Sequence, residues 1–328
     1  MLSRLPLVLC LSLASTACVL YTPIDLGSLG SPGELRETVL QGTTGPKLVL
    51  VEISGVISDE EDKTALGLGE RPSIVAETKS ILDRAGDDEK VAGLLLRIDS
   101  PGGSVSASDT LYHEIAKWKA DNKKPVVAFF NGLSTSGAYY LAMAADRVVA
   151  HPAAVTGSIG VIMPGFSIAG LMKKYGVADQ TLTSGAYKDA GSMLRDMRPE
   201  ERAQLLSVID DLYTRFREVV KEGRPALDAD KIKQLADGRV YSAPQALKLG
   251  LVDQLGYLDD AVAELKKRAN ATDVRVVSYH RANQTRENIY SRAPSLSLEA
   301  LQASLVETLQ RQGLAPGFYY LWPFALPR

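Results

Sequence analysis

Ser136 and Lys188 are the residues of this sequence whose types and surroundings best fit covalent chemistry on a carbonyl group. Ser136 lies in STSGAYY, where small neighbours leave its hydroxyl accessible, and Lys188 lies in SGAYKDAG, 52 residues further on. A serine hydroxyl is a weak nucleophile until a neighbouring base takes its proton. A lysine can be that base only when it is neutral. Burial must then bring its pKa from ~10.4 towards ~7–8, at a cost of roughly 3–4 kcal/mol.

Two further segments could support such a pair. Gly103 lies in DSPGGS, where a buried strand is expected to turn into a helix. Glycine lets a backbone approach a ligand closely, and the free N–H groups at a helix start can stabilise an oxyanion. Ser158 lies in TGSIG, a tight polar turn that could orient a neighbouring group.

Each of these residues also has a simpler structural explanation. Ser136 could be an N-cap of the helix that follows it, and Lys188 could be an ordinary solvated charge. The glycines around Gly103 could form a plain strand-to-helix connection, and Ser158 could merely close a strand. The residues taken one at a time leave both interpretations open.

The elements that must position these residues alternate between strands and helices from residue 47 onward. Apolar runs without polar alternation predict buried parallel strands, and periodic apolar positions predict covering helices. This order predicts one α/β domain with a mostly parallel sheet, whose functional loops leave the ends of the strands. The expected strands are 47–53, 91–98, 125–130, 147–150 and 274–278; the expected helices are 73–84, 106–120, 136–145, a long helix from Pro199, 243–248 and 258–269.

Composition excludes several classes of protein. Of 328 residues, 45% are hydrophobic and 23% are charged, which excludes a disordered chain. Thirty-seven basic against 39 acidic residues give a net charge of −2 and argue against a nucleic-acid binder. The two cysteines, Cys10 and Cys18, lie near the N-terminus, and there are three histidines. The body of the chain therefore offers no disulfide or thiol nucleophile, and we expect no metal site.

Residues 1–17 are predicted to be an export signal. Arg4 precedes an apolar stretch, and small residues stand directly before Cys18, as in the lipobox of bacterial lipoproteins. A lipidated Cys18 would anchor the protein to a membrane. An ordinary cleaved signal and an uncleaved anchor remain alternatives, and all three place the body outside the cytoplasm. Residues 18–46, rich in glycine, serine, threonine and proline, are predicted to be a tether.

The end of the chain differs in character from the body. Residues 281–328 are predicted to be a C-terminal extension, in which 297–312 could form an amphipathic helix. The aromatic run at 318–322 either packs against the parent sheet or contacts a subunit or membrane surface.

Together, these segments resemble the signal peptide peptidase A family, bacterial Ser/Lys proteases on the ClpP/crotonase fold. The resemblance runs from about Leu48 to Ala261. It is carried by LLLRIDSPGGSV, STSGAYYLAMAADRVVAHPAAVTGSIGVI, SGAYKDAG and GRVYSAPQALKLGLVDQLG, in the family's order. One copy of each motif resembles the short, single-domain form, which places the peptidase domain at 47–280. Ala138 departs from the family, many of whose members have a second glycine there.

The resemblance implies a role for each matching residue. Ser136 is then the nucleophile, Lys188 the general base, and Ser158 the serine that hydrogen-bonds the lysine. The Gly103 N–H is implied as an oxyanion donor, and we add the Gly137 N–H as a second. Acyl transfer through this Ser/Lys dyad needs no metal, nucleotide or other cofactor.

The resemblance also implies the biological setting. The family degrades membrane-derived peptides such as released signal peptides, so we expect apolar peptide substrates, a membrane-anchored protein of the cell envelope and a homo-oligomer whose cleft is assembled between subunits. Three other functions were weighed. A Ser-His-Asp peptidase similar to ClpP would need a histidine near Ser136, and His151 is the candidate. A crotonase-type acyl-CoA enzyme conflicts with an export signal. A non-catalytic scaffold would not need both Ser136 and Lys188.

Overall fold

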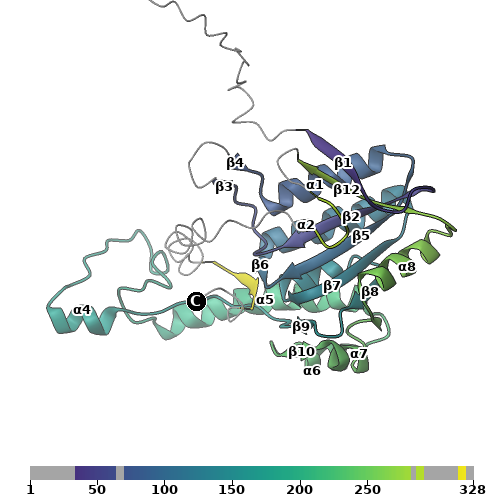
Figure 1. The fold of residues 1–328 in the computed structure, drawn as a ribbon. Coiled ribbons are helices and arrows are strands. Elements are labelled where there is room, and N and C mark those ends of the chain that lie inside the picture. The colour runs from purple at the N-terminus through teal and green to yellow at the C-terminus, as the bar shows by residue number, and fades with distance from the viewer. Residues whose placement is uncertain (1–33, 64–69, 282–285, 292–316, 323–328) are drawn as a thin grey trace, which may run out of the picture.

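The computed structural model describes residues 34–63, 70–281, 286–291 and 317–322. Within these residues the five predicted strands belong to one nine-stranded sheet, in which most neighbours run parallel (Figure 1). The antiparallel pairs are β1 with β12 and β9 with β10. The main order is β1 (Leu35–Gln41), β12 (Arg275–Arg281), β2 (Lys47–Ser54), β5 (Val91–Ser100), β7 (Val126–Thr135), β8 (Arg147–Ala150) and β11 (Gln254–Leu255); β9 (Val155–Gly157) pairs with β7, and β10 (Val240–Ser242) pairs with β9.

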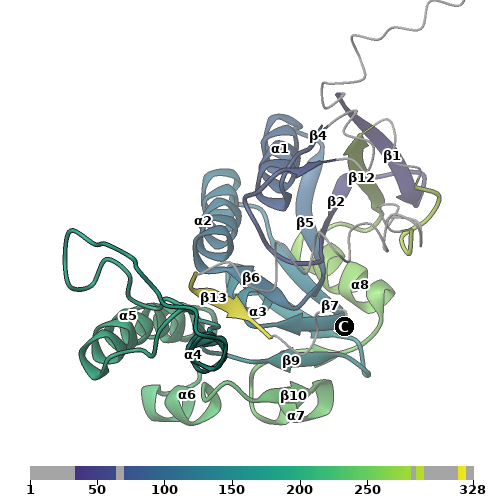
Figure 2. The same cartoon turned by 90° about the vertical axis from the view of Figure 1, so that its left-hand side faces the viewer.

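Helices cover both faces of the sheet, which is why the central strands are apolar without alternation. Strand β2 shows the two faces. Val49 and Val51 belong to one apolar cluster, and Leu48 and Leu50 belong to the other. Figure 2 shows the helices of the first face opposite α8 (Leu258–Arg268), which covers the second. The first face is covered by α1 (Ile74–Asp87), α2 (Val105–Asn122), α3 (Gly137–Ala142) and part of α5 (Pro199–Gly223).

The remaining elements are short. The short elements are β3 (Asp62–Lys63), β4 (Glu70–Arg71), β6 (Gly102–Ser104), α4 (Ala169–Tyr175), α6 (Ala229–Leu235), α7 (Ala243–Lys248) and β13 (Tyr319–Leu321). In the part of the chain that the structure describes, no helix is long and apolar enough to cross a bilayer.

Residues 164–198 follow β9 and precede α5 in the chain, and they reach away from the sheet (Figure 1). We call this segment the arm. None of the arm's residues is buried. Several of its large apolar side chains are instead exposed to solvent, with Leu182 the most exposed at 97%. The exposed set in the arm is Phe166, Leu171, Tyr175, Val177, Leu182, Tyr187 and Met197.

The predicted α/β class, with a mostly parallel sheet covered by helices, is confirmed. The expected strands and helices are present, with ends that shift by a few residues; β7, for example, continues five residues beyond the predicted end. One boundary needs correction. Residues 35–41 lie in the predicted tether, yet they form β1, which pairs along β12 at the sheet edge. The tether can therefore reach only as far as residue 34.

Candidate active site

Ser136 lies where β7 ends and α3 begins, and its side chain is only 1% exposed. Its backbone has φ 55° and ψ −117°, a left-handed conformation that a serine rarely adopts. Such a conformation costs about 1–3 kcal/mol and persists only where neighbouring bonds enforce it. Two bonds do so here: the Ser136 N–H donates to the Gly157 carbonyl at 2.8 Å, and the Ser136 carbonyl accepts from Tyr140 N–H at 2.9 Å.

The strained turn presents the Ser136 hydroxyl without a partner. The residue is at the N-cap position of α3, yet its side chain makes no capping hydrogen bond. Its Oγ is buried and has no hydrogen-bond partner within the described structure. A buried hydroxyl without a partner costs about 1–3 kcal/mol. The simple capping explanation for Ser136 therefore fails, and the geometry keeps a hydroxyl available for another group.

Ser158 is brought beside Ser136 by the pairing of two strand ends. Thr135 of β7 lies opposite Gly157 of β9 in a parallel ladder, so the next residues, Ser136 and Ser158, follow neighbouring strand ends. Ser158 also has a positive φ, 50°, and its N–H donates to the Arg239 carbonyl at 2.7 Å. The side chain is 7% exposed. The structure thus places Ser158, the predicted orienting serine, at the same corner of the sheet as Ser136, the predicted nucleophile.

The glycine turn predicted to carry oxyanion donors forms the next wall of this corner. Gly102 has φ 97°, and a Cβ on it would lie 2.7 Å from Gly137 N. Gly103 belongs to β6, and on one side of β6 it forms an isolated parallel bridge with Ile57. The two glycines predicted as donors thus both lie next to Gly102: Gly103 follows it in the chain, and the nitrogen of Gly137, the residue after Ser136, approaches it in space.

An extended segment from the far end of the chain lies along this wall. Strand β13 runs antiparallel to β6 with Tyr320 opposite Gly103. The ladder continues beyond the strand, where Trp322 N–H donates to the Pro101 carbonyl at 3.0 Å. A Cβ on Gly102 would lie only 2.1 Å from the Tyr320 carbonyl oxygen, and one on Gly137 would lie 3.1 Å from it. The Tyr320 carbonyl thus lies against Gly102 and against Gly137, the residue that follows Ser136.

Aromatic side chains hold that segment in place. The Tyr320 ring stacks on Tyr140 with centroids 5.1 Å apart and packs against Phe216 at 4.6 Å. Its hydroxyl donates to the Leu212 carbonyl at 2.7 Å, and burial raises the pKa of this phenol. Of the two alternatives for the aromatic run, packing against the parent domain is the one seen for residues 317–322. The amphipathic helix expected at 297–312 lies outside the described residues.

Lys188 does not meet Ser136 within one copy of the chain. It lies in the arm, on a turn closed by its N–H to the Gly185 carbonyl at 3.1 Å, and its side chain is exposed. Because the Ser136 hydroxyl has no described partner, neither Lys188 nor Ser158 bonds to it. The expectation of a buried lysine against this hydroxyl is therefore not met in the single chain. Cys18, the predicted lipidation site, lies outside the described residues.

None of the three histidines bonds to the Ser136 hydroxyl in the described structure. His151 caps a turn, accepting from Ala153 N–H at 3.1 Å, and its ring packs edge-on against Tyr257. His280 bonds to Thr38 at the opposite sheet edge, and His113 is exposed on α2. Among the described residues, no group of histidine, cysteine, aspartate and glutamate could hold a metal ion.

Two parts of this region were missed by the sequence analysis. The pairing of β13 with β6 joins segments far apart in the chain, and the aromatic run was its only sequence signal. A group of charged residues around Glu201, next to the Lys188 turn, was also missed. Its members alternate with polar residues and resemble any solvated helix start.

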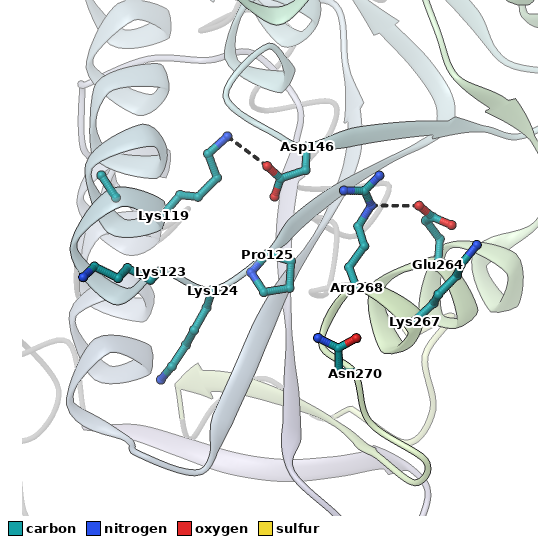
Figure 3. Close-up of a pocket in the computed structure, with 10 residues that line it drawn as sticks. Lys119, Lys123, Lys124, Pro125, Asp146, Glu264, Lys267, Arg268 and Asn270 are labelled. Atoms are coloured by element: carbon teal, nitrogen blue, oxygen red, sulfur yellow. Dashed lines mark hydrogen bonds and ion pairs between the residues drawn. The ribbon is translucent and has the colours of Figure 1, made fainter.

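A large surface hollow lies at the other end of the sheet. It has a volume of about 740 Å³ and lies beside Pro125, where β7 starts, whereas Ser136 follows the end of β7 (Figure 3). Its charged side chains pair among themselves, as Lys119 does with Asp146 and Arg268 with Glu264. No serine lines it, so it offers no hydroxyl nucleophile of the predicted kind; the lining residues are Lys119, Ala120, Lys123, Lys124, Pro125, Asp146, Glu264, Lys267, Arg268 and Asn270.

Comparison with known proteins places this arrangement in a family. Residues 119–272 match the model of peptidase family S49. A protein of Enterococcus faecium that carries the name signal peptide peptidase SppA is 36% identical over 76% of this chain and 72% of its own. A protein of Synechocystis sp. named as a protease is 38% identical over 67% and 73%. Protease 4 of Salmonella typhi is 32% identical, over 69% of this chain and 35% of its own.

Among solved structures, a mutant of ClpP1 from Listeria monocytogenes is similar to 65% of this chain and 94% of its own, at 16% identity and a TM-score of 0.40. The two bacterial relatives above 35% identity align over more than two thirds of both partners. The predicted family is thereby confirmed: this chain belongs to peptidase family S49, a family of serine peptidases.

Proposed function

We propose that this protein is a serine endopeptidase of the cell envelope that uses a Ser/Lys dyad to degrade extended, apolar, membrane-derived peptides such as released signal peptides. Ser136 is the nucleophile, Lys188 the general base and Ser158 the residue that orients the lysine. One observation carries the proposal. A buried serine hydroxyl without a partner, on a strained turn, lies beside glycines that already hold a peptide carbonyl.

The proposed reaction uses these residues in three steps. The neutral lysine amine takes the Ser136 proton as Oγ attacks the substrate carbonyl, and backbone N–H groups of Gly103 and Gly137 stabilise the oxyanion. The protonated lysine then gives its proton to the leaving amine as the C–N bond breaks. Water hydrolyses the resulting acyl-enzyme, with the lysine again taking a proton. The bent backbone at Ser136 is set before the substrate arrives, so no reorganisation is needed at that step.

The lysine comes from a neighbouring copy of the chain in this proposal. Within one copy the Ser136 hydroxyl has no partner, while Lys188 is exposed on an arm that reaches away from the sheet. The arm also exposes apolar side chains such as Leu182 and Tyr175. An exposed apolar surface of this kind is typical of a segment covered by a partner. A ring of copies in which each arm reaches the next sheet would bury these side chains and bring Lys188 to Ser136.

The substrate class follows from the wall that β13 occupies. A peptide would pair with β6 as an antiparallel strand, and one of its side chains would enter the aromatic pocket formed by Tyr140 and Phe216. The pocket is apolar, which favours hydrophobic sequences. Location in the envelope rests on the predicted export signal at residues 1–17 and on Cys18, which would tether the enzyme near membrane-derived peptides.

Mixing two inactive variants tests both the dyad and its assembly. Ser136→Ala and Lys188→Ala should each abolish cleavage of an apolar fluorogenic peptide, with His151→Ala as the active control. An equal mixture of the two inactive chains, unfolded and refolded together, should regain about a quarter of the wild-type rate, because a random ring pairs an intact serine with an intact lysine at one site in four.

The outcomes separate the alternatives. Turnover that survives Lys188→Ala removes the lysine from the chemistry. No recovery in the mixture, when both single variants are inactive and co-assemble in gel filtration, means that serine and lysine act within one copy. If the wild-type chain is folded and assembled but cleaves no peptide in a library of apolar sequences, the non-catalytic scaffold is the correct description.

A further inference from the structure

A charged cluster at the start of α5 holds the turn that carries Lys188. Its centre is Glu201, whose side chain is 0% exposed. The carboxylate accepts from Arg195 Nη1 at 2.9 Å, from Arg198 Nε at 2.9 Å and from the Arg198 backbone N–H at 3.0 Å. The hydrogen bond from Arg195 is the main reason why the pKa of Glu201 falls to about 2. Glu201 therefore remains an anion on which two arginines are fixed.

The two arginines extend from Glu201 to both ends of the Lys188 turn. Arg195 Nε donates to Asp189 Oδ2 at 2.7 Å, and its Nη2 donates to the Asp189 carbonyl at 3.3 Å. Arg198 donates to the Ala186 carbonyl on the other side of Lys188. Residues 186 and 189 are thus tied to the first turn of α5 by planar guanidinium groups, which fix direction as well as distance.

Within one copy, no fully buried side chain of the arm helps to hold this turn, because none of residues 164–198 is buried. A loop without buried side chains samples many conformations unless polar contacts order it. A single exposed ion pair contributes little, but a network around a buried carboxylate is worth more than isolated pairs. The cluster is the feature of the arm that can give Lys188 a defined position.

Asp189 adds an electrostatic reason for the cluster. It follows Lys188 directly in the chain, and an unpaired carboxylate beside an amine favours the protonated amine, which cannot act as a base. Arg195 is the main cause that lowers the pKa of Asp189, and it neutralises that carboxylate. The charged groups around the turn are Asp179, Asp189 and Arg195 on the arm, Arg198 at the N-cap of α5 and Glu201 in its first turn.

We infer that Arg195 and Glu201 are positioning residues for the general base: they fix the Lys188 turn and offset the charge of Asp189 so that the amine can be neutral when it meets the serine of its partner copy. This inference rests on the proposed function of Lys188. It concerns residues that contact neither substrate nor nucleophile, and so it predicts an altered base rather than a lost site.

The pH dependence of kcat/KM for the assembled full-length protein is the first test, measured from about pH 6 to about pH 10 on an apolar fluorogenic peptide. The acid limb of this profile is the range in which kcat/KM falls as the lysine becomes protonated. Arg195→Ala should move the acid limb to higher pH by about one unit, so kcat/KM at a given pH on that limb falls about tenfold and recovers at high pH. Arg195→Lys keeps a cation beside Asp189 and should regain most of the shift. Glu201→Gln removes an anion and leaves Arg195 paired with Asp189, so it should not move the acid limb up; it should instead lower kcat/KM at every pH, because the Lys188 turn is held less firmly.

Glu264→Gln is the matched control. Glu264 is a mostly buried carboxylate that also contacts two arginines, Arg147 and Arg268, at the opposite end of the sheet. The same chemical change there should leave kcat/KM unchanged at every pH, and with it the acid limb. A role in stability alone would lower the rate of Arg195→Ala at every pH without moving the limb, and that result would overturn the inference.

Hydrogen exchange separates failure of this inference from failure of the proposed function. Amides of residues 185–190 should exchange at least about tenfold faster in Arg195→Ala than in the wild type and Glu264→Gln. If Lys188→Ala keeps full activity, the proposed function falls, whatever the exchange shows. If Lys188→Ala is inactive while Arg195→Ala changes neither the acid limb nor the exchange of this turn, only the positioning role is refuted.

Discussion

Truncating Tyr320 to alanine should release β13 from β6 and so expose the edge of β6 beside Ser136. The side chain is completely buried, stacks on Tyr140, packs against Phe216 and donates a hydrogen bond to the Leu212 carbonyl. Strand β13 has only three residues, so this one ring anchors it. Removing a buried aromatic side chain costs about 3–5 kcal/mol, and in this case the cost falls on the docked state of β13 alone.

That cost translates into a rate. A loss of about 3 kcal/mol changes the ratio of docked to undocked β13 by roughly 100-fold. A substrate that pairs with β6 binds only the undocked state, so its apparent affinity falls by the undocked fraction. We expect kcat/KM of Tyr320→Ala for an apolar peptide to rise by about tenfold or more, with kcat little changed. The rise in kcat/KM reaches its limit when β13 is undocked in most molecules.

The control uses the same substitution one residue away. Tyr319 is less buried than Tyr320, so Tyr319→Ala should change kcat/KM much less. The assay is initial-rate hydrolysis of a fluorogenic peptide, with thermal unfolding recorded on the same samples. The reasoning is refuted if Tyr320→Ala lowers kcat/KM and unfolds in one transition several degrees below the wild type. In that case β13 would be a permanent part of the core.

Three further predictions concern the corner at Ser136 and the charged cluster at Glu201. Gly102→Ala should abolish activity and lower the unfolding temperature by several degrees, because its Cβ would meet the Tyr320 oxygen and Gly137 N at a φ of 97°. Ser136→Ala should abolish activity yet raise the free energy of unfolding by about 1 kcal/mol, because it removes a buried hydroxyl without a partner. The pKa of Glu201 is lowered from 4.5 to about 2, so its contribution to the stability of the arm is complete above about pH 4.5 and is lost as the pH falls towards 2. At that pH, pepsin should cut near residues 186–200 before the sheet unfolds.

The central sheet could be predicted because its strands are buried on both faces. Apolar runs such as that in β5 indicate buried strands once they alternate with helices, and the observed ends of these strands differ little from the predicted ends. Strand β1 was missed for the opposite reason. It lies at the edge, several of its residues are exposed, and its sequence LRETVLQ mixes charges with apolar residues. Its position depends on pairing with β12, which no local pattern encodes.

The chemistry at Ser136 was predictable to the extent that it is local. Small residues around Ser136 and glycines around Gly103 indicate close backbone approach, and the structure brings both to one corner. The partner of β6 is not local. Pairing between β6 and β13 joins segments separated by most of the chain, and three residues are too few to carry a strand pattern.

The placement of Lys188 marks a physical limit of sequence interpretation. The order of motifs identifies which lysine accompanies which serine, but a base needs only to be near the hydroxyl, and a symmetric assembly can satisfy that between copies as well as within one. Within one copy, Ser136 has no partner and Lys188 is held by Arg195, Arg198 and Glu201 in an exposed arm. An arm that is ordered by ions rather than by its own apolar residues keeps those residues free to bury against another copy. The same segment can therefore fix the base and build the interface that delivers it.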